Sequence, residues 1–142
     1  MRRIWIGVFA AGLAAGLAAC ATTEAGETSS VTLEGTVAYR ERMALPADAR
    51  ISVEVRDVSR QDVASILIAS EEFAAGGRQV PIPFSLSYDA TKILPRNTYA
   101  VSARITDPAG ELIFITDTRV PLPPPGDTVA LNLVRTGAGS RQ

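Results

Sequence analysis

The chain has 142 residues, with 14 basic and 15 acidic side chains, no histidine and one cysteine, Cys20. After the adjacent Arg2 and Arg3 its basic residues are scattered one at a time and include a single lysine, Lys92, which argues against a nucleic-acid partner because phosphate backbones require a clustered basic stripe. Without histidine or a second cysteine the usual nucleophiles, bases and metal ligands are missing, so we expect no enzyme, no cofactor and no metal site.

The first twenty residues show the three regions of a secretory signal. Arg2 and Arg3 precede an apolar run that begins at Ile4, and the run ends in the sequence LAAC at Cys20. The run is shorter than the roughly 20 residues that a membrane-spanning helix needs. We therefore expect residues 1–19 to be removed as a signal peptide.

The sequence LAAC resembles the lipobox of bacterial lipoproteins, whose cysteine receives a diacylglyceryl group and, after cleavage, becomes the lipidated N-terminus. The resemblance implies fatty acyl chains such as palmitate on Cys20, and two or three such chains anchor a protein to a membrane almost permanently. Two alternatives remain at this point. The residues around Cys20 could form an ordinary A-x-A cleavage site that releases a soluble protein, or the apolar run could be an uncleaved anchor.

Ala21 stands where the usual sorting rule, by the same resemblance, requires an aspartate to hold a lipoprotein in the inner membrane. We therefore expect an outer-membrane lipoprotein that faces the periplasm. Residues 20–30 contain no large apolar side chain after the cysteine and are predicted to be a flexible tether. Such a segment spans about 18 Å as a coil and at most about 35 Å when extended.

The next part of the chain, residues 31–135, is predicted to be one domain of about seven strands, and residues 136–142 a disordered tail. Alternation of apolar and polar side chains predicts strands at 31–39, 51–56, 84–88, 99–106 and 129–133, and two more segments, 66–68 and 112–115, are apolar on both faces. Residues 62–69 could also pass as a helix, but the β-branched Ile66 and Ile68 favour a strand. Asp107 to Gly110 is a typical turn. These features predict an all-β, antiparallel, two-layer sandwich.

Three stretches of this domain, ISVEVRDVSRQD at 51–62, QVPIPFSLSYD at 79–89 and RNTYAVSARITDPAGELIFITDT at 96–118, resemble the YbaY/YscW family of bacterial lipoproteins. The likeness extends from about Val31 to Val134. It implies a β-sandwich in the outer-membrane lipoprotein layer. One branch of the family comprises pilotins of type III secretion, which escort a secretin subunit to the outer membrane, and the other comprises envelope lipoproteins without a settled role. The sequence looks closer to the second branch, and the resemblance brings no catalytic residues with it.

The two strands that are apolar on both faces are the candidate site for a protein partner. If Leu112 and Phe114 face the core, Ile113 and Ile115 face outward, and the same question applies to Ile66 and Ile68. An exposed patch of such residues would suit another protein chain. The alternative is that loops or neighbouring segments cover these four isoleucines. The favoured function is thus an accessory or chaperone-like protein-binding lipoprotein, with a secretin-like envelope protein as one partner.

Glycan binding is the alternative function, since sugar rings stack on exposed aromatic side chains. The strand pattern assigns most aromatic residues to the core and leaves Tyr39 and Phe73 as candidate surface rings. The proline-rich segment 120–127 contains a P-x-x-P spacing between Pro121 and Pro124, which proline-recognition domains bind in other proteins. We expect it instead to be a stiff connection across the end of the sandwich, because proline donates no hydrogen bond to a sheet.

Overall fold

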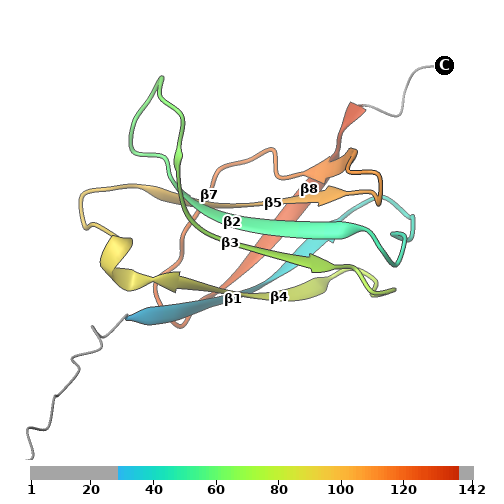
Figure 1. The fold of residues 1–142 in the computed structure, drawn as a ribbon, viewed down its shortest axis with the longest axis horizontal. Coiled ribbons are helices and arrows are strands. Elements are labelled where there is room, and N and C mark those ends of the chain that lie inside the picture. Colours follow the sequence, from blue (N-terminus) through green and yellow to red (C-terminus); the bar gives the residue numbers. More distant parts are fainter. Residues whose placement is uncertain (1–28, 138–142) are drawn as a thin grey trace, which may run out of the picture.

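The computed structural model describes residues 29–137, which form a single curled β-sheet (Figure 1). Its strands are β1 (Ser30–Tyr39), β2 (Arg50–Asp57), β3 (Ile66–Ala74), β4 (Ile82–Asp89), β5 (Tyr99–Thr106), β6 (Leu112–Ile115), β7 (Val120–Pro121) and β8 (Thr128–Arg135). One turn of 3-10 helix, η1 (Ala90–Lys92), follows β4. The prediction of an all-β domain is confirmed.

The strands follow the order β3-β2-β5-β6-β8-β1-β4, and the two end strands, β3 and β4, approach each other so that the sheet is nearly closed into a barrel. The barrel-like sheet is consistent with the predicted sandwich. One pairing differs from the antiparallel expectation, because β1 and β8 run parallel, with Glu34 opposite Thr128 and Tyr39 opposite Leu133. The two strands are almost a hundred residues apart, so no local turn fixes their direction.

The eighth strand arises from the proline-rich segment. Strand β6 ends at Ile115, so the first half of β5 has no pairing partner from β6 along the edge that faces it. Val120 and Pro121 pair there with Val101 and Ala100, and the amide of Leu122 donates to the carbonyl oxygen of Tyr99 at 3.1 Å. The segment expected to be only a connection is therefore also a short strand, and it accommodates the proline because the neighbouring Leu122 supplies the backbone donor to β5.

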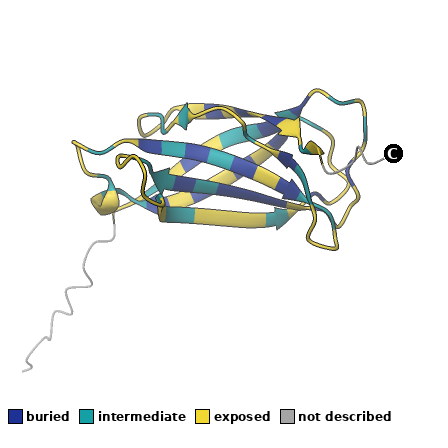
Figure 2. Cartoon of the chain, turned by 90° about the horizontal axis from the view of Figure 1, so that it is seen from above, coloured by how far each residue is buried: buried dark blue, intermediate teal, exposed yellow. Residues whose placement is uncertain are grey.

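The core fills the barrel interior with the residues that alternate inward along the strands (Figure 2). The largest side chains with almost no exposed surface are those of Phe114, Ile51, Ile82, Leu86, Ile105, Leu131, Val37, Val53, Val55 and Val101. Tyr39, predicted to be a candidate surface ring, is buried because it shares the inward parity of Leu33 and Val37 along β1, and its ring stacks on Phe114. Phe73 is half-buried, with the guanidinium of Arg78 5.3 Å from its ring centre.

The two segments that are apolar on both faces each contain a β-bulge. The pairing of β3 with β2 shifts register between Val55 and Arg56 of β2, which leaves Ile68 of β3 without a direct partner. The pairing of β6 with β5 shifts register between Ile105 and Thr106 of β5, which leaves Ile113 of β6 without one. A bulge shifts the inward and outward alternation by one residue. Both isoleucines consequently lie half-buried against the core.

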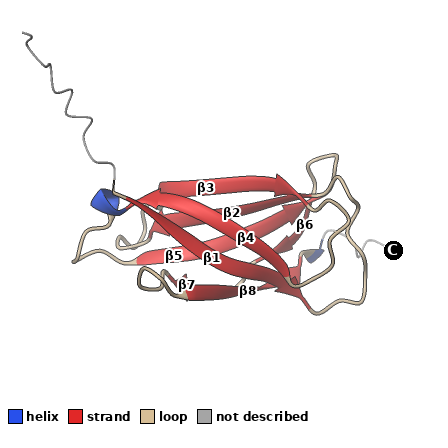
Figure 3. Ribbon diagram, turned by 90° about the horizontal axis from the view of Figure 1, so that it is seen from below, coloured by secondary structure: helices blue, strands red, loops and turns tan. Residues whose placement is uncertain are grey.

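The barrel has two distinguishable ends (Figure 3). At one end, which we call the N-terminal end, β1 begins at Ser30 opposite Asp89, and the loops 58–65 and 90–98 connect β2 to β3 and β4 to β5. The opposite end carries the turn at residues 107–110, where the amide of Gly110 donates to the carbonyl oxygen of Asp107 at 2.9 Å. The predicted turn is confirmed.

Candidate functional site

The four isoleucines predicted as a partner patch lie in two separate places. Ile66 begins β3 at the N-terminal end, opposite Asp57, and its side chain is 59% exposed. Ile115 lies toward the opposite end of the barrel, opposite Arg104 of β5, and is 37% exposed. Ile68 and Ile113 are the half-buried bulge residues. The structure therefore leaves one exposed isoleucine in each place and does not bring the four together.

Around Ile115 a second aliphatic side chain completes an exposed pair. Val134 of β8 lies directly opposite Ile115 in the antiparallel pairing of β6 and β8 and is 40% exposed. Sequence reasoning missed Val134, although the neighbouring Leu133 and Val134 also place apolar side chains on both faces of β8. The side chain of Leu133 is buried in the core, whereas the side chain of Val134 is exposed and does not contribute to the core.

Charged side chains flank this aliphatic pair on the outside of β2 and β5. The carboxylate of Glu54 accepts from the guanidinium groups of Arg56 and Arg104, with N to O distances of 2.7 Å in both cases. Glu54 and Arg104 line a shallow depression of about 120 Å³ together with Ile115. We call the surface formed by Glu54, Arg104, Ile115 and Val134 the outer-face surface. An apolar centre with a charged rim is the usual composition of a protein-binding surface.

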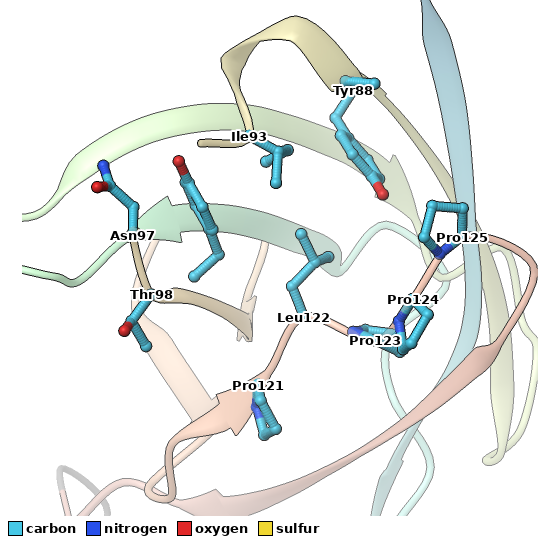
Figure 4. A pocket seen from close by; sticks show the side chains of 11 residues that line it. Tyr88, Ile93, Asn97, Thr98, Pro121, Leu122, Pro123, Pro124 and Pro125 are labelled. Carbon is cyan, nitrogen blue, oxygen red and sulfur yellow. The ribbon is translucent and has the colours of Figure 1, made fainter. Parts of the chain in front are cut away.

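A larger groove, of about 550 Å³, opens at the N-terminal end between the β4–β5 loop and the proline-rich segment (Figure 4). Its walls are the side chains of Tyr88, Ala90, Ile93, Asn97, Thr98, Tyr99 and residues 121–125, none of which carries a charge. Pro121, Pro123, Pro124 and Pro125 form one wall. The proline-rich segment, which we predicted to be a stiff connection, thus forms a wall of this groove. Sequence reasoning missed the groove.

Two tyrosines contribute to the groove in different ways. The hydroxyl of Tyr99 accepts from the amide of Leu94 at 2.8 Å and donates to the carbonyl oxygen of Lys92 at 3.0 Å, so it holds the β4–β5 loop in place. Burial raises the pKa of the Tyr88 phenol above its ordinary value, which keeps that group neutral. The lining is therefore uncharged and suited to an apolar group.

No metal-binding cluster is assembled in the described part of the chain. Residues 29–137 contain no group of three carboxylates or other ligands that could hold a metal ion. Glu71 and Glu72, the adjacent carboxylates of β3, lie opposite Val53 and Ser52 respectively, so they project from opposite faces of the strand. Lys92 is exposed in η1.

The structure also bears on glycan binding and on the membrane. Among residues 29–137 every tyrosine and phenylalanine is buried or half-buried, so that part of the chain offers no exposed aromatic platform for a sugar. The same residues include no helix that is long and apolar enough to cross a membrane. Cys20, the predicted lipidation site, lies outside the described residues, as do the predicted signal peptide and most of the predicted tether.

Comparison with known proteins places this geometry among bacterial secretion lipoproteins. A family described as a type III secretion system lipoprotein chaperone, YscW, matches residues 28–133 of the chain. The match begins just before β1 and ends within β8, so it covers nearly the whole barrel.

Two individual proteins are similar to the chain. The uncharacterized lipoprotein YbaY of Escherichia coli (strain K12) is 37% identical over 98 residues, which cover 69% of this chain and 51% of YbaY. The chain thus aligns with about half the length of that curated relative. A solved structure of an alternative pilotin from the type II secretion system of Vibrio cholerae superimposes with a TM-score of 0.71 and 41% identity, and covers 75% of this chain and 97% of the pilotin chain.

Proposed function

This chain belongs to the YscW family of type III secretion system lipoprotein chaperones, and from that membership we propose that it is an outer-membrane lipoprotein that binds another envelope protein without catalysis. The anchor in this proposal is the lipid on Cys20, and the partner is a secretin-like subunit. The similarity to a type II secretion pilotin supports a partner of that kind.

The observation that carries the proposed binding role is the exposed pair of Ile115 and Val134. Two large aliphatic side chains that face each other across neighbouring strands form a small apolar centre in contact with water. The Glu54 and Arg104 ion pair beside them provides groups that can orient a partner. We place the partner contact on this outer-face surface, far from the end at which the chain joins the barrel.

The mechanism of the proposed protein is a rise in local concentration. The lipid keeps the barrel at the membrane, and the ten residues from Ala21 to Ser30 let it reach sites within a few tens of ångströms. Under these conditions a weak contact becomes effective, because the partner is held in the same membrane layer. No group on the chain needs to react.

The test replaces the apolar centre with an ion pair of matched geometry. In full-length chain, the double variant Ile115→Lys and Val134→Asp keeps a favourable cross-strand pair but removes the aliphatic contact. We expect crosslinking to a secretin-type subunit in isolated membranes to fall about tenfold or more, the scale for losing an apolar anchor of an interface. The same chain with Thr32→Lys and Ser87→Asp is the control, since these two exposed residues also face each other, on β1 and β4.

The control variant should retain the wild-type crosslink. Unchanged crosslinking of the Ile115 and Val134 variant would remove the outer-face surface from the proposal. A secretin-type subunit that is never captured by any form of the chain would contradict the proposed partner.

A further inference from the structure

Exposed aliphatic side chains are concentrated at the N-terminal end of the barrel. Of the six large hydrophobic residues that the described chain leaves exposed, four lie there, and the other two are Ile115 and Val134. The four are Val63 (59% exposed), Ile66 (59%), Leu67 (47%) and Leu94 (53%). Single exposed aliphatic residues need no explanation, but four at one end of the barrel, two in neighbouring loops and two at the start of β3, indicate an interaction surface.

The loop that carries Val63 and leads into Ile66 and Leu67 is bound to the loop that carries Leu94. The side-chain amide of Asn97 donates to the Asp57 carboxylate at 2.7 Å, and the amide of Thr98 donates to the hydroxyl oxygen of Ser59 at 2.8 Å. The amide of Val58 also donates to the carbonyl oxygen of Thr98 at 2.8 Å. These hydrogen bonds hold the β2–β3 loop and the β4–β5 loop together. Ile66 and Asn97 line the same surface depression.

At this end of the barrel the cationic side chains are more exposed than two of the nearby carboxylates. Arg60, Lys92 and Arg96 are exposed. Two of the nearby carboxylates are half-buried and turned toward their own loops: Asp57 accepts from Ser59 and Asn97, and Asp89 accepts from the amide and hydroxyl of Thr91. Asp62 is the exposed carboxylate of the β2–β3 loop. Exposed cations beside exposed aliphatic groups match the phosphates and acyl chains of a lipid surface.

The chain enters the barrel at this same end. The carbonyl oxygen of Ser29 accepts from the amide of Ala90 at 2.8 Å, so the start of β1 is attached to the beginning of η1, in the loop that carries Leu94. Cys20 precedes Ser30 by ten residues, which span at most about 35 Å. A lipid on Cys20 would consequently hold the membrane closer to this end than to any other part of the barrel.

We propose that the N-terminal end of the barrel is a membrane-docking face, in which Val63, Ile66, Leu67 and Leu94 enter the lipid interface and Arg60, Lys92 and Arg96 contact headgroup phosphates. This inference rests on the proposed anchoring at Cys20 and adds a second contact to it. Docking fixes the orientation of the barrel on the membrane. The apolar groove beside Leu122 then opens toward the lipid, and the outer-face surface lies at the opposite end, accessible to a protein partner.

Tryptophan fluorescence in the full-length chain tests this orientation. Trp5, the one tryptophan of the sequence, lies in the predicted signal peptide, and Trp5→Phe removes its signal from any uncleaved chain. A single reporter is placed either by Leu94→Trp at the docking face or by Val134→Trp at the opposite end, both at exposed aliphatic positions. Each protein is reconstituted into vesicles of phosphatidylethanolamine and phosphatidylglycerol, with or without bromine on the acyl chains. Because interfacial side chains lie about 5–10 Å into the headgroup boundary, we expect brominated lipid to reduce the Leu94→Trp signal about twofold or more.

The Val134→Trp signal should not change in the same vesicles. Equal quenching of the two reporters, or none, would overturn the docking face. In the Leu94→Trp protein, the further substitutions Ile66→Glu and Leu67→Glu should abolish quenching, whereas Ile115→Glu at the opposite end should not. Circular dichroism of each variant reports whether the β-barrel is retained.

The anchoring on which the inference rests is measured separately. The mass of the N-terminal peptide that contains Cys20 shows whether the lipid is attached. A lipidated chain whose reporters respond equally would contradict the docking face and leave the anchor standing, while an unlipidated chain would contradict the anchor.

Discussion

The rings of Tyr39 and Phe114 stack with their centres 4.3 Å apart and their planes 15° from parallel. They come from the end of β1 and the middle of β6, two strands that β8 separates in the sheet. The Tyr39 hydroxyl donates to the carbonyl oxygen of Met43 at 2.8 Å. Burial, and then the charge of Glu41, raise the pKa of this phenol, so it remains a donor well above neutral pH.

Removal of this ring should be among the most destabilising single changes in the barrel. We expect Tyr39→Ala to lower the free energy of unfolding by about 3–5 kcal/mol, as for other buried aromatic side chains, since a cavity would face Phe114. Tyr39→Phe keeps the stack and loses one hydrogen bond, for an expected cost of about 1 kcal/mol. Urea unfolding of both variants measures the difference. Equal losses would show that the hydroxyl, not the stacked ring, stabilises this corner.

Gly35 should tolerate no side chain. A methyl group at this position of β1 would overlap the backbone carbonyl oxygen of Val129 on β8 and would lie 2.8 Å from Cζ of Phe84 and from Cγ1 of Val129, closer than such atoms approach in proteins. Gly35→Ala should therefore cost about 1–3 kcal/mol or more in urea unfolding, because the backbone of β8 as well as two core side chains must move. Thr36→Ala, at the half-exposed neighbour on the same strand, is the matched control and should change stability by less.

The Asp57 carboxylate should make stability depend on acidity. Hydrogen bonds from the hydroxyl and amide of Ser59 lower its pKa below the ordinary value of 3.8, and Asn97 adds to this effect. Because this pKa is lower in the folded state than in the unfolded state, the carboxylate contributes its full stabilisation at pH values above the unfolded-state pKa. The stabilisation is lost as the pH falls through the folded-state pKa.

We therefore expect the urea concentration at the unfolding midpoint of the wild-type chain to decrease as the pH is lowered from about 5 to about 2. The decrease should be less steep in Asp57→Asn. Ser59→Ala, which removes the hydroxyl donor, should show an intermediate slope. Identical slopes in all three proteins would mean that Asp57 gains no net stabilisation from its partners.

The single cysteine should decide whether the chain stays on the membrane. Cys20→Ser removes the only thiol, and we expect the variant to incorporate no palmitate label and to leave the outer-membrane fraction. Fractionation and metabolic labelling measure the two effects. A serine variant that remains in the outer membrane would show that the anchor lies elsewhere in the chain.

Ala21 should determine which membrane the lipoprotein occupies. With Ala21→Asp we expect the chain to keep its lipid and to move to the inner-membrane fraction, by resemblance to the sorting rule of bacterial lipoproteins. Ala21→Ser is the matched control and should remain in the outer membrane. An aspartate variant that fractionates like the control would contradict the expected sorting.

Much of this protein could be predicted from its sequence alone because the information is local. Alternation of apolar and polar side chains located five of the eight strands, since a strand buries every second residue whatever it pairs with, and two short apolar runs located two more. Lipidation at Cys20 is likewise a prediction from a short motif, and it stays a prediction because the structure describes residues 29–137.

Tertiary structure alone decided where the strands meet and which apolar side chains remain exposed. The parallel pairing of β1 with β8, the bulges at Ile68 and Ile113, and the separation of Ile66 from Ile115 depend on contacts between distant segments, which no local pattern encodes. The apolar groove and the paired loops at the N-terminal end have the same origin, because each is built from segments that only the closing of the sheet brings together.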